Sequence, residues 1–151
     1  MKIFFFSLIV IVGVTLVSCQ KGADSPRGFS LPEGDAALGK EVFLKYQCLS
    51  CHTLKGVEQV GIVKNDKLSV RLGGKSTKIK TYAELLTSVI NPSHKFPRGY
   101  PVAMITQDGQ SKMTIFNDVM TVTELVNLVH FLQPNYELVP FTRSQYQRYG
   151  Y

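Results

Sequence analysis

The chain of 151 residues has no tryptophan, only three cysteines and no run of consecutive basic or acidic residues. Three is an odd number, so disulfides within the chain cannot use all of the cysteines. The net charge of +6 comes from scattered lysines and arginines, which argues against a nucleic-acid partner. Hydrophobic residues make up 44% and charged residues 19%, which is ordinary for a folded chain, and the length suits one domain.

The longest apolar stretch lies at the N-terminus and is too short to be a typical membrane span. Lys2 precedes a mainly apolar run at positions 3–17, whereas a spanning helix needs ~20 such residues. The run ends in LVSC at positions 16–19, which resembles a bacterial lipobox, where cleavage before the cysteine frees it for acylation. We therefore expect a lipoprotein signal peptide at residues 1–18, acylation of Cys19, and export. The alternative is an uncleaved N-terminal anchor helix.

Residues 19–33 connect this segment to the rest of the chain. They contain Gly, Pro, Ser and charged residues without a hydrophobic period, which predicts a flexible tether. A single acyl chain binds a membrane reversibly, and two or more hold firmly. The chain is therefore expected to be lipid-anchored, with its domain facing the periplasm or the cell exterior.

The other two cysteines form the most specific motif. Cys48 and Cys51 are followed directly by His52, which gives C-x-x-C-H, the signature of c-type haem attachment. Two thiols three residues apart on a tight helical turn can each form a thioether with one haem vinyl group, and the next residue presents its imidazole to the iron. We expect one covalently attached haem c, held by Cys48 and Cys51, with His52 as the proximal iron ligand.

Three other chemistries use a C-x-x-C pair. A redox dithiol usually follows a strand in a βαβ unit, and no strand pattern precedes Cys48. A zinc site needs further ligands, whereas His94 and His130 stand alone in the sequence. A disulfide would close a loop of three residues, which stabilises a chain little. Export and the motif together favour haem.

Hydrophobic periodicity and capping residues predict three helices. Asp35 lies near the start of the first, where a negative charge favours the helix dipole. The second and third each follow a capping box, a threonine with a glutamate three residues later, and end at a proline. The first extends from Gly34 through Tyr46, the second lies between Thr81–Glu84 and Asn91–Pro92, and the third lies between Thr121–Glu124 and Pro134.

Four positions in the outer helices carry a family resemblance. Gly39 and Phe43 are four residues apart, and Leu128 and Phe131 are three apart. With C-x-x-C-H directly after the first helix, residues 34–134 resemble class I cytochromes c. The resemblance implies that the two helices cross, because the glycine permits a close approach and the aromatic side chain packs across it. It also implies an all-α, small cytochrome c fold with about three principal helices around one covalently bound haem. The stretches at 60–63 and 68–72 are expected to be loops.

The resemblance further implies a methionine ligand on a loop before the last helix. Met113 lies at the matching distance from Glu124 and follows a polar segment, so we predict that it is the distal iron ligand. The alternatives are Met104 and Met120, and to a lesser extent His94. His130 lies between the two helix-crossing residues in sequence and is not expected to be a ligand.

The chain departs from the family pattern at two places. Thr114 stands where a proline usually follows the distal methionine. No proline occurs between His52 and Pro92, although the family uses a proline carbonyl there to accept the Nδ1–H of the proximal histidine. We expect another backbone carbonyl, near residues 65–68, to replace it.

A closed His/Met shell leaves no iron position for a substrate, so we expect an electron carrier rather than an enzyme. The partners would be redox proteins, among them a respiratory membrane complex. The alternatives are a permanently docked haem subunit of a larger respiratory or dehydrogenase complex, and a haem enzyme or gas sensor with an open sixth position. Lysines at the haem edge would steer an acidic partner; the candidates are Lys45, Lys55, Lys75 and Lys112.

Residues 135–151 form a C-terminal tail with few aliphatic side chains. It contains four tyrosines, one phenylalanine and two arginines, and Tyr and Arg are favoured at protein interfaces. One interpretation is a strap over the domain or a frayed end. The other is a segment that docks on a partner.

Overall fold

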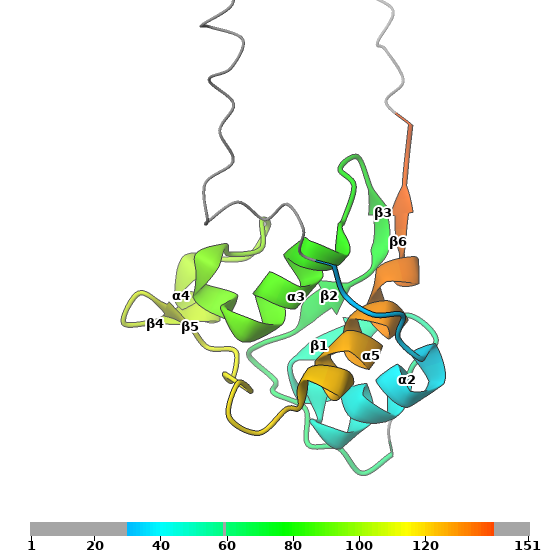
Figure 1. The fold of residues 1–151 in the computed structure, drawn as a ribbon. Coiled ribbons are helices and arrows are strands. Elements are labelled where there is room, and N and C mark those ends of the chain that lie inside the picture. Colours follow the sequence, from blue (N-terminus) through cyan, green and yellow to red (C-terminus); the bar gives the residue numbers. More distant parts are fainter. Residues whose placement is uncertain (1–29, 59, 141–151) are drawn as a thin grey trace, which may run out of the picture. The chain divides into compact units, whose positions relative to one another are not determined.

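The structure is a computed structural model that describes residues 30–58 and 60–140. The predicted signal peptide, Cys19 and most of the tether lie outside these residues, as do residues 141–151 of the tail. The described helices are α2 (Ala36–Lys45), α3 (Tyr82–Ile90), α4 (Val102–Ile105) and α5 (Val122–Leu132), with 3₁₀ turns η1 (Cys48–Ser50), η2 (Pro92–His94) and η3 (Gln133–Asn135). The strands are β1 (His52–Leu54), β2 (Val70–Leu72), β3 (Gly74–Ser76), β4 (Thr106–Gln107), β5 (Gln110–Ser111) and β6 (Tyr136–Leu138) (Figure 1). No helix in these two ranges is both long and apolar enough to traverse a bilayer.

The three predicted helices correspond to α2, α3 and α5, and each begins at a side-chain cap. Asp35 is the N-cap of α2, where its Oδ1 accepts hydrogen bonds from the backbone N–H groups of Ala37 and Leu38. At α5 both halves of the Thr121–Glu124 capping box form. At α3 only the Thr81 half forms, because the Glu84 carboxylate binds Lys95 instead.

The predicted crossing of the first and last helices is confirmed. A Cβ added to Gly39 would lie 2.0 Å from the backbone oxygen of Asn127, so α2 and α5 approach too closely for any other residue. The rings of Phe43 and Phe131 lie next to this point, with centroids 5.7 Å apart. Phe43 is 1% exposed and lies at the centre of the hydrophobic core. The buried core cluster consists of Val42, Phe43, Leu49, Leu54, Leu85, Val89, Leu128, Val129 and Leu132.

The prediction of an all-α fold is wrong, because the described part of the chain has a mixed α/β structure. Its six strands form three two-stranded sheets. Two sheets are parallel, β1 with β2 and β3 with β6, and the third is the antiparallel hairpin β4–β5. Strands of two or three residues are too short to show the alternating pattern by which strands are recognised in a sequence. The stretch at 68–72, expected to be a loop, contains β2.

Glycines and one aspartate set the geometry of these small sheets. Gly73, with a φ angle of 72°, separates β2 from β3, and Gly74, with a φ angle of 90°, begins β3. Gly73 also lies against Asn135, directly before β6, so a larger residue would push β6 away. Asp108 and Gly109 both have positive φ and join β4 to β5, as in a type I′ turn.

The first residues of the expected tail belong to this architecture. Tyr136–Leu138 form β6, which pairs in register with Gly74–Ser76. The pairing continues one residue further, since the N–H of Val139 donates to the carbonyl of Ser76 over 2.8 Å. Tyr136 is half-buried and packs against the core cluster. The described start of the tail is therefore held against the domain.

Candidate functional site

The two cysteines of the motif lie on one tight turn directly after α2. Gln47, with a φ of 51°, ends the helical path, and η1 then carries the chain from Cys48 to Cys51. The N–H of Cys51 donates to the carbonyl of Cys48 over 3.3 Å, and buried Leu49 fixes the turn to the core. Both cysteines are free thiols and half-buried. Burial raises the pKa of Cys48 to about 11, so its thiol is protonated at neutral pH.

His52 follows this turn as the first residue of β1. It pairs with Val70 of the parallel strand β2. Its Nδ1 lies 3.1 Å from the carbonyl oxygen of Val70. The predicted type of partner, a backbone carbonyl, is therefore present, but it belongs to Val70 and not to residues 65–68. The reason is the β1–β2 pairing, which was not expected from the sequence.

The protonation state of His52 follows from this contact. A carbonyl oxygen only accepts hydrogen bonds, so Nδ1 must carry the proton and donate it. Burial lowers the pKa of His52 and outweighs the opposing effect of the bond to Val70. The imidazole is therefore neutral at physiological pH, with its lone pair on Nε2. This is the form in which histidine binds a metal.

Two backbone hydrogen bonds hold the segment that carries Val70 against the cysteine turn. The N–H of Asn65 donates to the carbonyl of Ser50, and the N–H of Val70 donates to the carbonyl of Cys51, both over 2.8 Å. The cysteines, His52 and the carbonyl that orients His52 thus form one hydrogen-bonded unit. The structure brings these three predicted site residues together.

Met113 lies on a separate segment that follows the β4–β5 hairpin. It is half-buried, and its N–H donates to the Oγ of Ser111 over 3.2 Å. Ser111 in turn donates its own N–H to the Oγ of Ser93 in η2. Of the alternatives, Met104 is 37% exposed on α4, and Met120 packs against the core cluster. The assignment of Met113 as a ligand partner of His52 stays a prediction.

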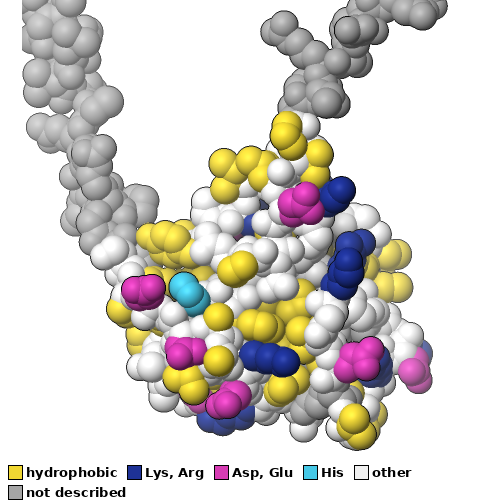
Figure 2. Space-filling model, turned by 90° about the vertical axis from the view of Figure 1, so that its right-hand side faces the viewer, with side chains coloured by type: hydrophobic (Ala, Val, Ile, Leu, Met, Phe, Trp, Pro, Cys, Tyr) yellow, Lys and Arg dark blue, Asp and Glu magenta, His cyan; other side chains and the backbone are white. Residues whose placement is uncertain are grey.

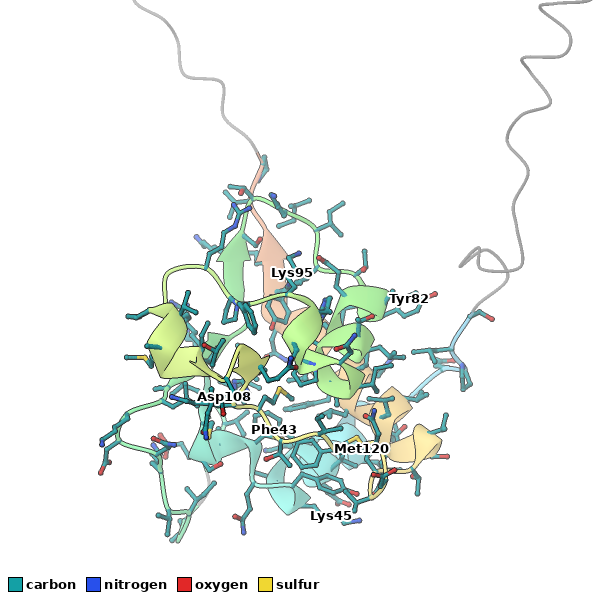
Figure 3. All side chains as sticks on the ribbon, turned by 90° about the vertical axis from the view of Figure 1, so that its left-hand side faces the viewer. Phe43, Lys45, Tyr82, Lys95, Asp108 and Met120 are labelled. Atoms are coloured by element: carbon teal, nitrogen blue, oxygen red, sulfur yellow. The ribbon has the colours of Figure 1, made fainter. Side chains whose placement is uncertain are left out.

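Tyr46 connects the end of α2 with the loop that follows Met113. Its hydroxyl lies 2.9 Å from the carbonyl of Val119 and 3.0 Å from Oε2 of Glu124. Its ring meets that of Phe116 edge-on, with centroids 5.3 Å apart. Lys45 adds an ion pair of 2.6 Å to Glu124 and lies at the edge of the domain, whereas Phe43 lies inside it (Figure 3). These contacts form one cluster, which joins the helix before the cysteine turn to the loop after Met113. Its members are Lys45, Tyr46, Phe116, Val119 and Glu124.

The charge of this cluster depends on pH. The pKa of Glu124 is lowered to about 2, first by the hydrogen bond from Lys45 and next by the N–H of Thr121. Because this folded-state pKa lies below the ordinary value, the contribution of the ionised Glu124 carboxylate to stability is fully present at neutral pH. It is lost as the pH falls toward 2 and the carboxylate is protonated.

We expect Tyr46→Phe to lower the unfolding temperature by a few degrees. The variant removes the one hydroxyl proton that the Val119 carbonyl and the Glu124 carboxylate share, but it keeps the ring against Phe116. Thermal unfolding followed by circular dichroism measures the effect. Lys45→Gln is the control, because it keeps the Tyr46 hydroxyl and removes the exposed ion pair with Glu124 and the cation–π contact with the Tyr46 ring; its smaller effect should weaken in high salt. An unchanged melting temperature in Tyr46→Phe would contradict this role.

The four lysines proposed to steer a partner differ in their surroundings. Lys45 is paired with Glu124, and Lys112 donates from its Nζ to the carbonyls of Ala103 and Met104. Lys55 and Lys75 are exposed. Two of the four lysines expected to steer a partner, Lys45 and Lys112, therefore bind groups of the domain itself.

The remaining histidines stand apart from the motif. His94 is exposed, and its Nδ1 lies 2.7 Å from the carbonyl of Asn91. His130 is exposed on α5, as its place between two helix-crossing residues predicts. Within residues 30–58 and 60–140, no group of three or more His, Cys, Asp or Glu side chains is arranged to hold a metal ion.

Three positioning residues were not identified from the sequence. Asn127 is buried in α5, and its Oδ1 accepts the N–H of Asp35 over 2.8 Å, which ties the start of α2 to α5. The sequence did contain one indication of this role, because Asn127 is a polar residue within the apolar stripe of its helix. Tyr46 and Val70 gave no local signal, because their partners are distant in the sequence.

Comparison of the chain with protein-family models, with curated proteins and with solved structures found no match. The resemblance to class I cytochromes c therefore depends on this chain's own residues. The described features that bear on it are the α2–α5 crossing and the turn that carries Cys48, Cys51 and His52. The short sheets are the feature that departs from it.

Proposed function

We propose that the chain is a membrane-tethered, mono-haem c-type cytochrome that transfers single electrons between redox protein partners. The observation that carries the proposal is the contact between Nδ1 of His52 and the carbonyl of Val70. It fixes the ring and leaves the Nε2 lone pair of a neutral imidazole for iron. The free thiols of Cys48 and Cys51 lie on the turn directly before it, at the spacing that covalent attachment needs.

The small hydrophobic core of the domain leaves room for a stabilising prosthetic group. Twelve hydrophobic side chains are buried among the described residues. A domain this small buries a modest share of its surface by itself. A bound macrocycle would add the apolar contact area that this small core lacks.

The protein's own residues would then fulfil distinct roles. Cys48 and Cys51 would hold the group covalently, and Val70 would keep His52 oriented as the proximal donor. The thioether of Met113 would close the sixth position and favour the reduced metal. Haem iron supplies the one-electron chemistry by cycling between the ferric and ferrous states.

The direct test is the optical spectrum of the purified full chain, expressed in a bacterium that attaches haem c. A pyridine haemochrome spectrum typical of two thioether bonds is expected, together with a methionine–iron band in the oxidised protein. A protein purified without haem under these conditions would contradict the proposal. A reduced protein that binds carbon monoxide readily at neutral pH would instead indicate an open sixth position.

Met113→Ala should keep covalent haem but lose the methionine–iron band and lower the midpoint potential. Both thioethers and His52 are untouched, whereas the sulfur that favours ferrous iron is gone. Absorption spectroscopy and redox titration measure these effects. Met104→Ala and Met120→Ala are the matched controls and should retain the band, although Met120→Ala should cost about 2 kcal/mol of stability. Loss of the band in either control alone would place the ligand elsewhere.

A further inference from the structure

The β3–β6 pair forms a two-stranded ribbon at one end of the domain (Figure 1). A ribbon of two strands has little stability on its own. Tyr136 fixes its base, since this residue packs against the core cluster. Gly73 alone separates the ribbon from β2, whose Val70 orients His52. The ribbon is therefore attached closely to the candidate site.

Positive charge is concentrated on this part of the chain. No acidic residue occurs between Asp66 and Glu84, whereas five basic residues do. Lys75 and Lys78 are exposed, and Lys80 lies 4.0 Å from Glu84 in a loose ion pair. On the partner strand β6, Glu137 is in register with Lys75 and offsets part of its charge, whereas Lys78 lies beyond the paired residues of β3. The ribbon thus presents a net positive surface.

Exposed apolar side chains accompany these lysines. Ile79 lies between Lys78 and Lys80 and is 68% exposed. Leu138 is 52% exposed and pairs in register with Ser76, three residues before Ile79. Figure 2 shows hydrophobic side chains gathered at the end of the domain where the described chain stops, with charged side chains just below them. Apolar tips flanked by lysines suit an interface between lipid headgroups and acyl chains.

We infer that residues 74–80, with β6, form a second membrane contact, in which the lysines bind anionic headgroups and Ile79 enters the interface. The inference uses the membrane tether of the proposed function but does not require haem. The tether predicted from the sequence, residues 19–33, would have a root-mean-square length of about 21 Å and would extend to about 50 Å. It keeps the domain at a high local concentration near lipid, so a weak contact is sufficient.

This contact would fix how the candidate site faces its partners. The ribbon is joined to β2 through Gly73, and β2 pairs with the strand that begins at His52. A domain held by lipid at the ribbon therefore presents the cysteine turn and His52 in one orientation relative to the membrane plane. An otherwise free tether would leave that orientation random.

The absence of tryptophan makes a specific test possible, because Ile79→Trp would be the sole tryptophan of the chain. The full-length variant is incorporated through its own N-terminus into phosphatidylcholine vesicles with or without phosphatidylglycerol. With the anionic lipid, we expect blue-shifted emission and at least twofold stronger quenching by brominated acyl chains. Replacing Lys75 and Lys78 by glutamine in the same variant should remove the difference. Val60→Trp, at a fully exposed position between β1 and β2, is the control and should respond to neither lipid.

Two measurements separate failure of this inference from failure of the proposed tether. Flotation of the vesicles reports whether the chain is membrane-bound at all. A chain that floats while Ile79→Trp emits as it does in buffer contradicts the ribbon contact and points to an acidic protein as the occupant. A chain that fails to float contradicts the tether. The Ile79→Trp variant is then mixed in solution with preformed vesicles of the same composition. If its tryptophan emission does not change, the ribbon contact is contradicted as well.

Discussion

Replacing Cys48 and Cys51 together by serine is expected to yield a chain without covalent haem and without a cooperatively folded domain. Serine cannot form the thioethers, and the hydroxyls would lie where two half-buried sulfurs now lie. The thioethers would keep the group on the chain in both states, but its apolar contacts form only in the folded state; without them we expect most of the free energy of unfolding to be lost. The small number of buried side chains leaves little to compensate.

Pyridine haemochrome analysis and thermal unfolding followed by circular dichroism measure the two losses. Ser50→Ala is the matched control, since Ser50 lies between the two cysteines in sequence and its Oγ donates a weak hydrogen bond to the sulfur of Cys51. This control should retain haem and a single unfolding transition. A double-serine variant that unfolds cooperatively without haem would show that the core is sufficient by itself and would remove the stability argument for the cofactor.

Gly39→Ala should destabilise the domain by about 3 kcal/mol or more, although alanine is the better helix former. In an isolated helix the change would stabilise by ~1 kcal/mol. Here the added Cβ would lie 2.0 Å from the backbone oxygen of Asn127 and 2.6 Å from the Cβ of Phe131. Neither atom can move without separating α2 from α5, and overpacking of this kind typically costs 1–3 kcal/mol, occasionally more.

The sign of the change in the free energy of unfolding shows whether helix propensity or overpacking dominates in Gly39→Ala. Chemical denaturation of the haem-loaded protein measures the free energy of unfolding, with Lys40→Ala as the control. Lys40 is the next residue of the same helix and is exposed, so its replacement should change stability by a few tenths of a kcal/mol. A Gly39→Ala variant more stable than the parent would mean that the two helices do not cross at this residue.

The helical part of the fold was predictable because its determinants are local. Capping residues, the 3.6-residue period and the spacing of Gly39 and Phe43 all lie within single segments. The crossing of α2 and α5 followed from matching these segments to a family pattern. The sheets could not be predicted in this way, since their pairing joins residues far apart in strands too short to carry a pattern. One exception existed: Asp108-Gly109 is a hairpin signal that the sequence offered.

The same distinction applies to the candidate site. Cys48, Cys51 and His52 were found from their spacing alone. The carbonyl that orients His52 was misplaced by two residues, because it depends on the β1–β2 register. Lys45, a candidate for steering an acidic partner, forms an ion pair with Glu124, a residue 79 positions away. Local chemistry was therefore readable from the sequence, whereas the partners of each group depended on the tertiary structure.

The pairing of α2 with α5 also has a consequence for the order of folding. The N–H of Asp35 and the side chain that accepts it, Asn127, are 92 residues apart. During synthesis from the N-terminus, α2 emerges long before its packing partner, and closing so large a loop is slow. Throughout that interval the cysteine turn lacks the contacts that bury it and raise the pKa of Cys48. Its thiols are therefore most accessible and most reactive in the unfinished chain, and they become less reactive once the C-terminal helix arrives.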